Sequence, residues 1–200
     1  MLEDKAINIK KYRDLMLVLA SGVMSSTAVV GPAMHGRADG ASVRFMHGRA
    51  DGASVRFMHG DPQEIALLEA AEAVELEDTR GDYEALQLGA FSKQKGRAIA
   101  GYKIGNKAVY YARGSVDSIL EICSHVLLEG KAKKMTESEV WSVREIAKAT
   151  ELKGNTVIAL AVKRTLVGKP SVEKDFMLVG LVSTSNSLDE RSRETIQHLS

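Results

Sequence analysis

A fixed positive charge stands next to a glycine at the point where a predicted strand is followed by a predicted helix. The stretch "AVYYARGSVDSIL" (residues 108–120) holds apolar strand-type residues, then Arg113 and Gly114, then a helix start at Ser115. A guanidinium is suited to phosphate recognition, and a glycine lets a ligand approach the backbone closely. This pattern therefore raises the hypothesis of an anion-binding or nucleotide-binding site.

Three further residues could complete a nucleotide pocket. Phe91 lies near the end of a predicted strand and offers a ring for purine stacking, with Lys93 just after it in "FSKQKGR". Glu64 lies near the start of a predicted helix, where its carboxylate could accept a hydrogen bond from an exocyclic amine. Polyphosphate needs cations, which this basic stretch and Arg113 provide.

The same residues also have ordinary structural interpretations, and the residues alone leave both open. Glu64 is an acid in the first turn of a helix, where the dipole favours negative charge. Phe91 could belong to the core, and "KQKGR" could be a solvated turn. Three other polar residues also lie at predicted strand ends or helix starts: Lys95, Arg97 and Asp117.

The common catalytic sequence motifs are absent. The chain contains no GxxxxGK[ST], HExxH, CxxC or GxSxG, and no GxGxxG that follows a strand. His35, His47 and His59 have a spacing that a sequence duplication creates, so we predict no metal site from them. We predict no catalytic residue in this chain.

Composition argues against nucleic acid as a partner. The 27 basic and 26 acidic residues nearly cancel, and aromatic residues make up only 5%, whereas nucleic-acid binding usually leaves a basic footprint.

The single cysteine, Cys123, cannot form an internal disulfide, which favours a reducing compartment. Its neighbours are apolar at core-like spacing, so we predict a small buried hydrophobic residue.

The pattern of apolar residues and turn signals predicts an α+β fold, a twisted, mainly antiparallel sheet flanked by helices. Asp61 and Pro62 are good N-cap and first-turn residues for a helix over 61–76. The predicted strands are 85–93, 97–105, 107–114, 155–164 and 175–184, and the further helices are 10–24, 115–126, 136–154 and 188–199.

An uncharged stretch over residues 15–34 has nearly the length needed to cross a bilayer. Polar residues dilute its second half, and Glu3, Asp4 and Asp14 do not suit a signal peptide. We therefore expect a core helix here.

The sequence "HGRADGASVRFM" occurs twice without change, at 35–46 and 47–58. Solenoid repeats are longer, and their copies normally diverge in sequence. We interpret the pair as a local duplication inside a loop over residues 31–60, which the fold tolerates because closure entropy grows slowly with loop length.

Five segments resemble the nucleotide-binding (N) domain of P-type cation-transporting ATPases. "GDPQEIALLEAA" is similar to that domain's "GDPTE" segment, "FSKQKGR" to its Phe-Ser segment, and "ARGSVDSILEICSHV" to its "KGAPE" segment. "GNTVIALAVK" and "FMLVGLVSTSNSLDERSRETI" resemble two later segments. The five occur in the family's order and together cover residues 60–196.

The resemblance implies an ATP-binding module on the cytoplasmic side of a membrane. It implies that Phe91 stacks on adenine, Glu64 contacts the adenine amine, Arg113 and Gly114 line the pocket, and Lys93 approaches the phosphates. Mg²⁺ would accompany the ATP. Such a domain does not hydrolyse ATP by itself but presents it to a phosphorylation domain, and actuator and transmembrane domains complete the parent pump.

The chain departs from the family pattern at several positions. The DKTGT, TGES and GDGxND motifs are absent, so the catalytic aspartate of the pump is not in this chain. Arg113 replaces a lysine, Thr156 replaces an arginine, and "DPPR" corresponds to residues 186–189, which begin with Asn186. The ion that the parent would transport is not encoded in these segments.

We expect a single nucleotide-binding domain over 1–200, with a core at 61–182 and a C-terminal segment at 183–200 that leads toward the phosphorylation domain. An isolated domain of this kind is expected to be a monomer. Two alternatives stay open: a regulatory interaction domain with a decayed pocket, and a stand-alone phosphatase with a similar cap.

Overall fold

The computed structural model describes residues 13–31, 45–47, 56–87, 89–168 and 173–185. Its helices are α1 (Arg13–Ser25), α2 (Pro62–Ala73), α3 (Val116–Leu120) and α4 (Glu137–Glu151), with one 3₁₀ turn, η2 (Arg80–Asp82). The main-sheet strands are β4 (Glu84–Gln87), β5 (Arg97–Ile104), β6 (Lys107–Gly114), β7 (Cys123–Leu128), β8 (Lys131–Lys134), β9 (Asn155–Leu166) and β10 (Phe176–Ser185). The predicted C-terminal helix and Asn186 lie outside the described residues.

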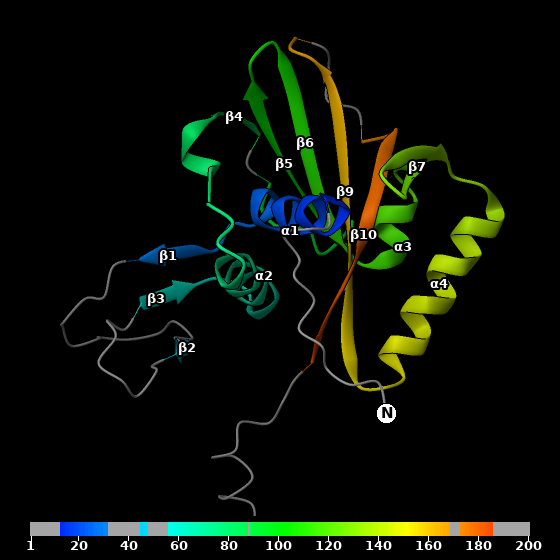
Figure 1. Cartoon of the computed structure of the whole chain (residues 1–200), viewed down its shortest axis with the longest axis horizontal. Coiled ribbons are helices and arrows are strands. Elements are labelled where there is room, and N and C mark those ends of the chain that lie inside the picture. Colours follow the sequence, from blue (N-terminus) through cyan, green and yellow to red (C-terminus); the bar gives the residue numbers. More distant parts are fainter. Residues whose placement is uncertain (1–12, 32–44, 48–55, 88, 169–172, 186–200) are drawn as a thin grey trace, which may run out of the picture.

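A seven-stranded sheet forms the centre of the described part of the molecule (Figure 1), with the order β4-β5-β6-β9-β10-β7-β8. Every neighbouring pair is antiparallel except β7 and β10, which are parallel. The predicted α+β fold with a mainly antiparallel sheet is confirmed. Gly105 has a φ of 62° at the first position of the two-residue turn between β5 and β6, as a tight hairpin requires.

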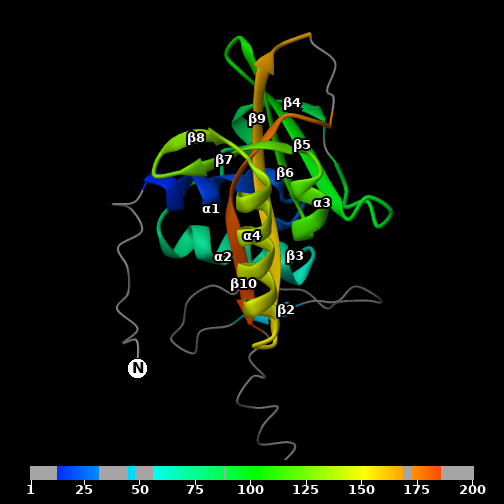
Figure 2. The same cartoon turned by 90° about the vertical axis from the view of Figure 1, so that its right-hand side faces the viewer.

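Alternating residues of the strands give the sheet two apolar faces. One face carries Val109, Leu160, Val162 and Val179 and packs against Leu17 and Val18 of α1. The other face carries residues such as Ala112, Ala161 and Phe176, which pack with Ile119 of α3 and Ala147 of α4. Figure 1 shows α1 lying across the sheet, and Figure 2 shows α4 running along β9.

The predicted core helix near the N-terminus is confirmed in α1, whose second half is buried. No helix among the described residues combines the length and the apolar character needed to cross a membrane. Cys123, which we predicted to be a small buried hydrophobic residue, is half-buried and packs against the hydrophobic core. Burial raises the pKa of its thiol to about 12.

The predicted helix over 115–126 is wrong in its second half. Ser115 does cap α3, its side chain accepting from the backbone N–H of Ser118, but the helix ends at Leu120. Strand β7 follows and is joined to β8 by a turn in which Glu129 and Gly130 both have positive φ, the signature of a tight hairpin. Pairing with β10 and burial of Val126 override the helical spacing.

The predicted strand over 85–93 is also shorter than expected. Strand β4 ends at Gln87, and Phe91 lies in an irregular segment just before an isolated bridge between Ser92 and Arg97. Phe91 is therefore not at the end of a strand.

A small second sheet involves the duplicated segment. Strands β2 (Phe45–His47) and β3 (Arg56–His59) are the corresponding stretches of the two copies and pair with each other, while β1 (Val29–Gly31) pairs with the other edge of β3. The stretch that we interpreted as a loop thus contains two short strands.

Candidate functional site

The side chains of Glu64 and Arg113 meet in the interior as an ion pair. Glu64 lies in the first turn of α2, which starts here because the Asp61 carboxylate accepts from the N–H of Gln63 and Pro62 follows the cap. Arg113 lies near the end of β6, on the sheet face that α1 covers. Both residues are almost fully buried, at 2% and 4% exposure, so the two elements are joined by a desolvated charge pair.

The carboxylate of Glu64 also accepts hydrogen bonds from the segment that follows α1. The hydroxyl of Ser26 and the backbone N–H of Thr27 donate to Oε2 at 3.1 and 3.0 Å. The hydroxyl of Thr27 lies 3.2 Å from Oε2 and 3.3 Å from Oε1. Glu64 therefore links α2 with the C-terminal end of α1.

Two guanidinium groups bind the carbonyl oxygens at that end of α1. Arg113 Nε donates to Ser25 O at 3.1 Å, and Arg80 Nη1 donates to Ser26 O and Ala28 O, both at 2.9 Å. A helix C-terminus favours positive charge. Asp78 in turn holds Arg80 through a two-point contact, and this hydrogen bonding lowers the pKa of the Asp78 carboxyl.

Burial lowers the pKa of the Arg113 guanidinium, and the nearby carboxylate of Asp61 opposes that effect. A guanidinium nevertheless stays charged in proteins. Arg113 is thus a permanent buried cation, and its charge is balanced by the carboxylate of Glu64.

Two glycines permit this packing. A Cβ on Gly60 would stand 2.4 Å from the Cβ of Ala28, and a Cβ on Gly114 would stand 2.4 Å from the carbonyl oxygen of Gly96. The space beside Gly114 is therefore occupied by the chain's own backbone at the start of β5. This contact explains why a glycine is needed at position 114. That a ligand approaches the backbone at Gly114 stays a prediction.

Phe91 and Lys93 lie on the surface, in the segment that leads into β5. Ser92 pairs with Arg97, which pairs with Gly114, so Ser92 and Gly114 are two strand spacings apart, about 10 Å. The Phe91 side chain is 47% exposed, and Lys93 is exposed in the following turn. The structure thus joins Glu64 to Arg113 and places the backbone of Phe91 near the same strand ends.

The remaining polar residues of the prediction have partners of their own. Lys95 Nζ and Arg97 Nη2 bind the carboxylate of Glu173 at 2.7 and 2.9 Å. Asp117 pairs with Arg144 of α4 at 2.7 Å. Glu173 therefore ties the segment before β10 to the basic turn that holds Lys93.

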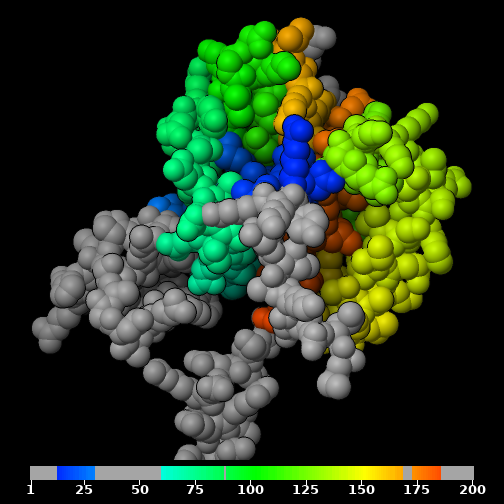
Figure 3. Space-filling model, viewed as in Figure 1, coloured from blue at the N-terminus to red at the C-terminus, as the bar shows by residue number. Residues whose placement is uncertain are grey.

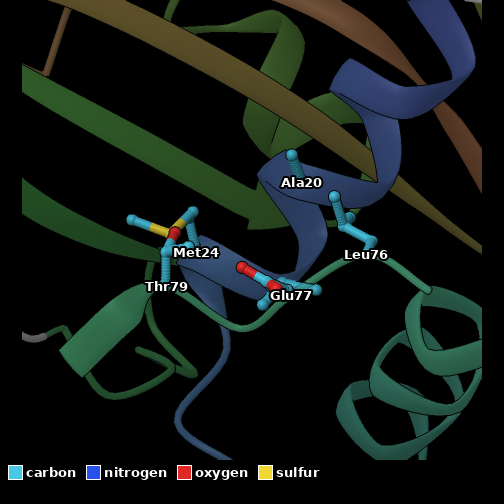
Figure 4. Close-up of a pocket in the computed structure, with 6 residues that line it drawn as sticks. Ala20, Met24, Leu76, Glu77 and Thr79 are labelled. Atoms are coloured by element: carbon cyan, nitrogen blue, oxygen red, sulfur yellow. The ribbon is translucent and has the colours of Figure 1, made fainter. Parts of the chain in front are cut away.

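Three adjoining cavities lie along α1, and none of them is lined by the predicted site residues Glu64, Phe91, Lys93, Arg113 and Gly114. One of about 310 Å³ lies between α1 and the segment after α2, where Met24 faces Thr79 and Leu76 lies near Ala20 (Figure 4). It shares Ala20 and Leu76 with a larger hollow of about 970 Å³ that extends toward β9 and the β7–β8 turn. Figure 3 shows part of α1, in blue, at the surface between these elements.

The chain matches the family described as "P-type ATPase, cytoplasmic domain N" over residues 42–191, which is 150 of its 200 residues. The chain belongs to this family. It is therefore a domain of a cation pump, and the resemblance inferred from the five segments is confirmed. None of the curated proteins matches the chain. The N-domain match begins after α1, so Ser26 and Thr27 lie outside it.

Sequence reasoning missed Ser26, Thr27 and Arg80 as partners of the site. Their hydrogen bonds reach across 37 to 54 residues of sequence, and no local pattern encodes such contacts. The only available signal was the run of small hydroxyl residues "SST" directly after the apolar helix.

Proposed function

We propose that this N domain binds ATP beside the Glu64–Arg113 pair and presents it to a separate phosphorylation domain of the pump. The observation that carries the proposal is the meeting of Glu64 and Arg113, 49 positions apart in the chain (113 − 64), close to the strand ends near Phe91. The exposed ring of Phe91 supplies a stacking surface for adenine. Lys93 supplies an exposed cation for the phosphates.

In this proposal the domain is a binding module and performs no hydrolysis. Mg²⁺ arrives with the nucleotide, and the transferred phosphate reaches an aspartate of the phosphorylation domain. Closure of the two domains, together with actuator and transmembrane domains, would couple that transfer to cation movement. The buried ion pair holds α2 against the end of β6, so these two elements are already in place before the nucleotide binds.

Calorimetric titration with MgATP tests the proposal. Phe91→Ala is expected to weaken binding by about 1–3 kcal/mol through lost stacking, whereas Trp141→Ala, an exposed aromatic residue on α4, leaves it unchanged. Lys93→Ala is expected to weaken binding, and Lys107→Ala, at the opposite end of β6, is its control. Equal affinities for Phe91→Ala and the parent protein would remove the nucleotide site from this position.

One observation favours a second candidate, a regulatory interaction domain with a decayed pocket. The acceptor positions of Glu64 are already engaged by the chain's own donors. A chain that binds no MgATP at millimolar concentration, yet unfolds cooperatively, would support this alternative.

A further inference from the structure

The carboxylate of Glu64 has no free acceptor position in this conformation. A carboxylate has about four lone-pair sites. Four groups occupy them: the Arg113 guanidinium is ion-paired at Oε1, the Ser26 hydroxyl and the Thr27 N–H bond to Oε2, and the Thr27 hydroxyl is shared between the two oxygens. An adenine amine can bond to Glu64 only after one of these four donors leaves.

The four donors differ in how readily they can leave. Arg113 and Ser26 are each 4% exposed, and each makes a second hydrogen bond. Arg113 donates to Ser25 O, and the hydroxyl oxygen of Ser26 accepts from the N–H of Ala28. The N–H of Thr27 is fixed by the backbone between α1 and β1. A donor that is buried and bound twice is costly to displace.

The hydroxyl of Thr27 is the exception. Thr27 is exposed. Its Oγ1 is shared between the two oxygens of Glu64 at 3.2 and 3.3 Å, which is longer than the bonds from the Ser26 hydroxyl and the Thr27 N–H. After rotation about its side-chain bond, this hydroxyl can bond to water instead. Thr27 is thus the exposed residue among those that bond to Glu64.

We propose that Thr27 sets the affinity and the base selectivity of the nucleotide site by competing with the purine amine for the carboxylate of Glu64. The inference rests on the proposed ATP-binding function. Thr27 acts through Glu64 and is a positioning residue. When the Thr27 hydroxyl leaves, only a base with a donor at the 6-position can replace its hydrogen bond to Glu64. Adenine carries such a donor, and hypoxanthine does not.

The test uses the full chain, with Thr27→Val as an isosteric variant that lacks the hydroxyl and Thr27→Ser as the variant that keeps it. Each protein is titrated calorimetrically with MgATP and with magnesium inosine triphosphate, which has a 6-oxo group in place of the amine. Thermal unfolding followed by circular dichroism establishes that each variant is folded.

Thr27→Val is expected to bind MgATP about three- to tenfold more tightly than the parent, as removal of one competing hydrogen bond implies. Its affinity for inosine triphosphate is expected to stay the same, and Thr27→Ser is expected to behave as the parent does.

An unchanged or weaker MgATP affinity in Thr27→Val would overturn the role of Thr27, as would an equal change for both nucleotides. If Phe91→Ala still lowers the affinity in that case, the ATP site itself stands. If neither the parent nor Thr27→Val binds either nucleotide, both the site and the role of Thr27 are overturned.

Discussion

Glu64 and Arg113 form a buried ion pair that joins the first turn of α2 to the end of β6. Removing one member of such a pair leaves the other charge buried without compensation, at a cost of about 3–5 kcal/mol. We therefore expect Glu64→Gln and Arg113→Met each to lower the free energy of unfolding by about that amount, measured by urea denaturation.

The double variant Glu64→Gln/Arg113→Met is the matched control for this pair. It removes both charges, so its loss of stability is expected to be clearly smaller than the sum of the two single losses. Losses that simply add would show that the two side chains do not interact in the folded domain.

Gly60 is expected to be intolerant of a side chain because of its contact with Ala28. A Cβ at this position would overlap the Cβ and approach the Cα of Ala28, and overpacking of this kind costs about 1–3 kcal/mol. Gly60→Ala is expected to lose this much in urea denaturation. Gly81→Ala, where a Cβ meets nothing within 4 Å, is the control; equal losses at both positions would refute the contact.

The pairing of Glu173 with Lys95 and Arg97 makes a pH-dependent contribution to stability. The hydrogen bond from Lys95 lowers the pKa of the Glu173 carboxyl, burial opposes this, and Arg97 adds to the lowering. The stabilisation is therefore complete above the ordinary pKa of glutamate, about 4.3, and is lost as the pH falls through the lowered pKa of the folded state.

Comparison of the parent with Glu173→Gln from pH 7 to pH 3 checks this dependence. The difference in their free energies of unfolding should be constant at the upper end and shrink at the acid end. A difference that stays constant down to pH 3 would mean that the carboxylate charge does not matter to the contact.

Deletion of one copy of the duplicated segment is expected to leave the site intact. Deleting residues 35–46 or 47–58 gives the same protein, because the copies are identical. Strand β2 pairs with β3, which keeps β1 on its other edge, and shortening a loop by 12 residues changes closure entropy little. We expect a free energy of unfolding within about 1 kcal/mol of the parent and unchanged MgATP affinity; loss of either would give the duplication a structural role.

Sequence reasoning was most successful where local chemistry decides the structure. The Asp61–Pro62 cap of α2 and the start of α3 at Ser115 each depend on neighbouring residues in the sequence. It failed at β7, because the strand is stabilised by β10, more than 50 residues away in sequence (176 − 123 = 53). Helical spacing alone could not reveal that partner.

For the site, the residue types were informative and their partners were not. Glu64 and Arg113 were predicted to converge on a ligand, whereas the structure shows them bound to each other. The donors Ser26 and Thr27 come from the end of α1, which is distant in sequence from both. Long-range hydrogen bonds of this kind follow from the packing of α1 against α2 and the sheet.

Amide chemical-shift mapping during titration with MgATP is the most direct test of ATP binding beside the Glu64–Arg113 pair. We expect saturable shifts that cluster at Thr27, Phe91, Lys93 and Gly114, with little change along α4. Shifts that cluster along α4 or the β7–β8 hairpin, or no shifts at millimolar MgATP, would contradict it.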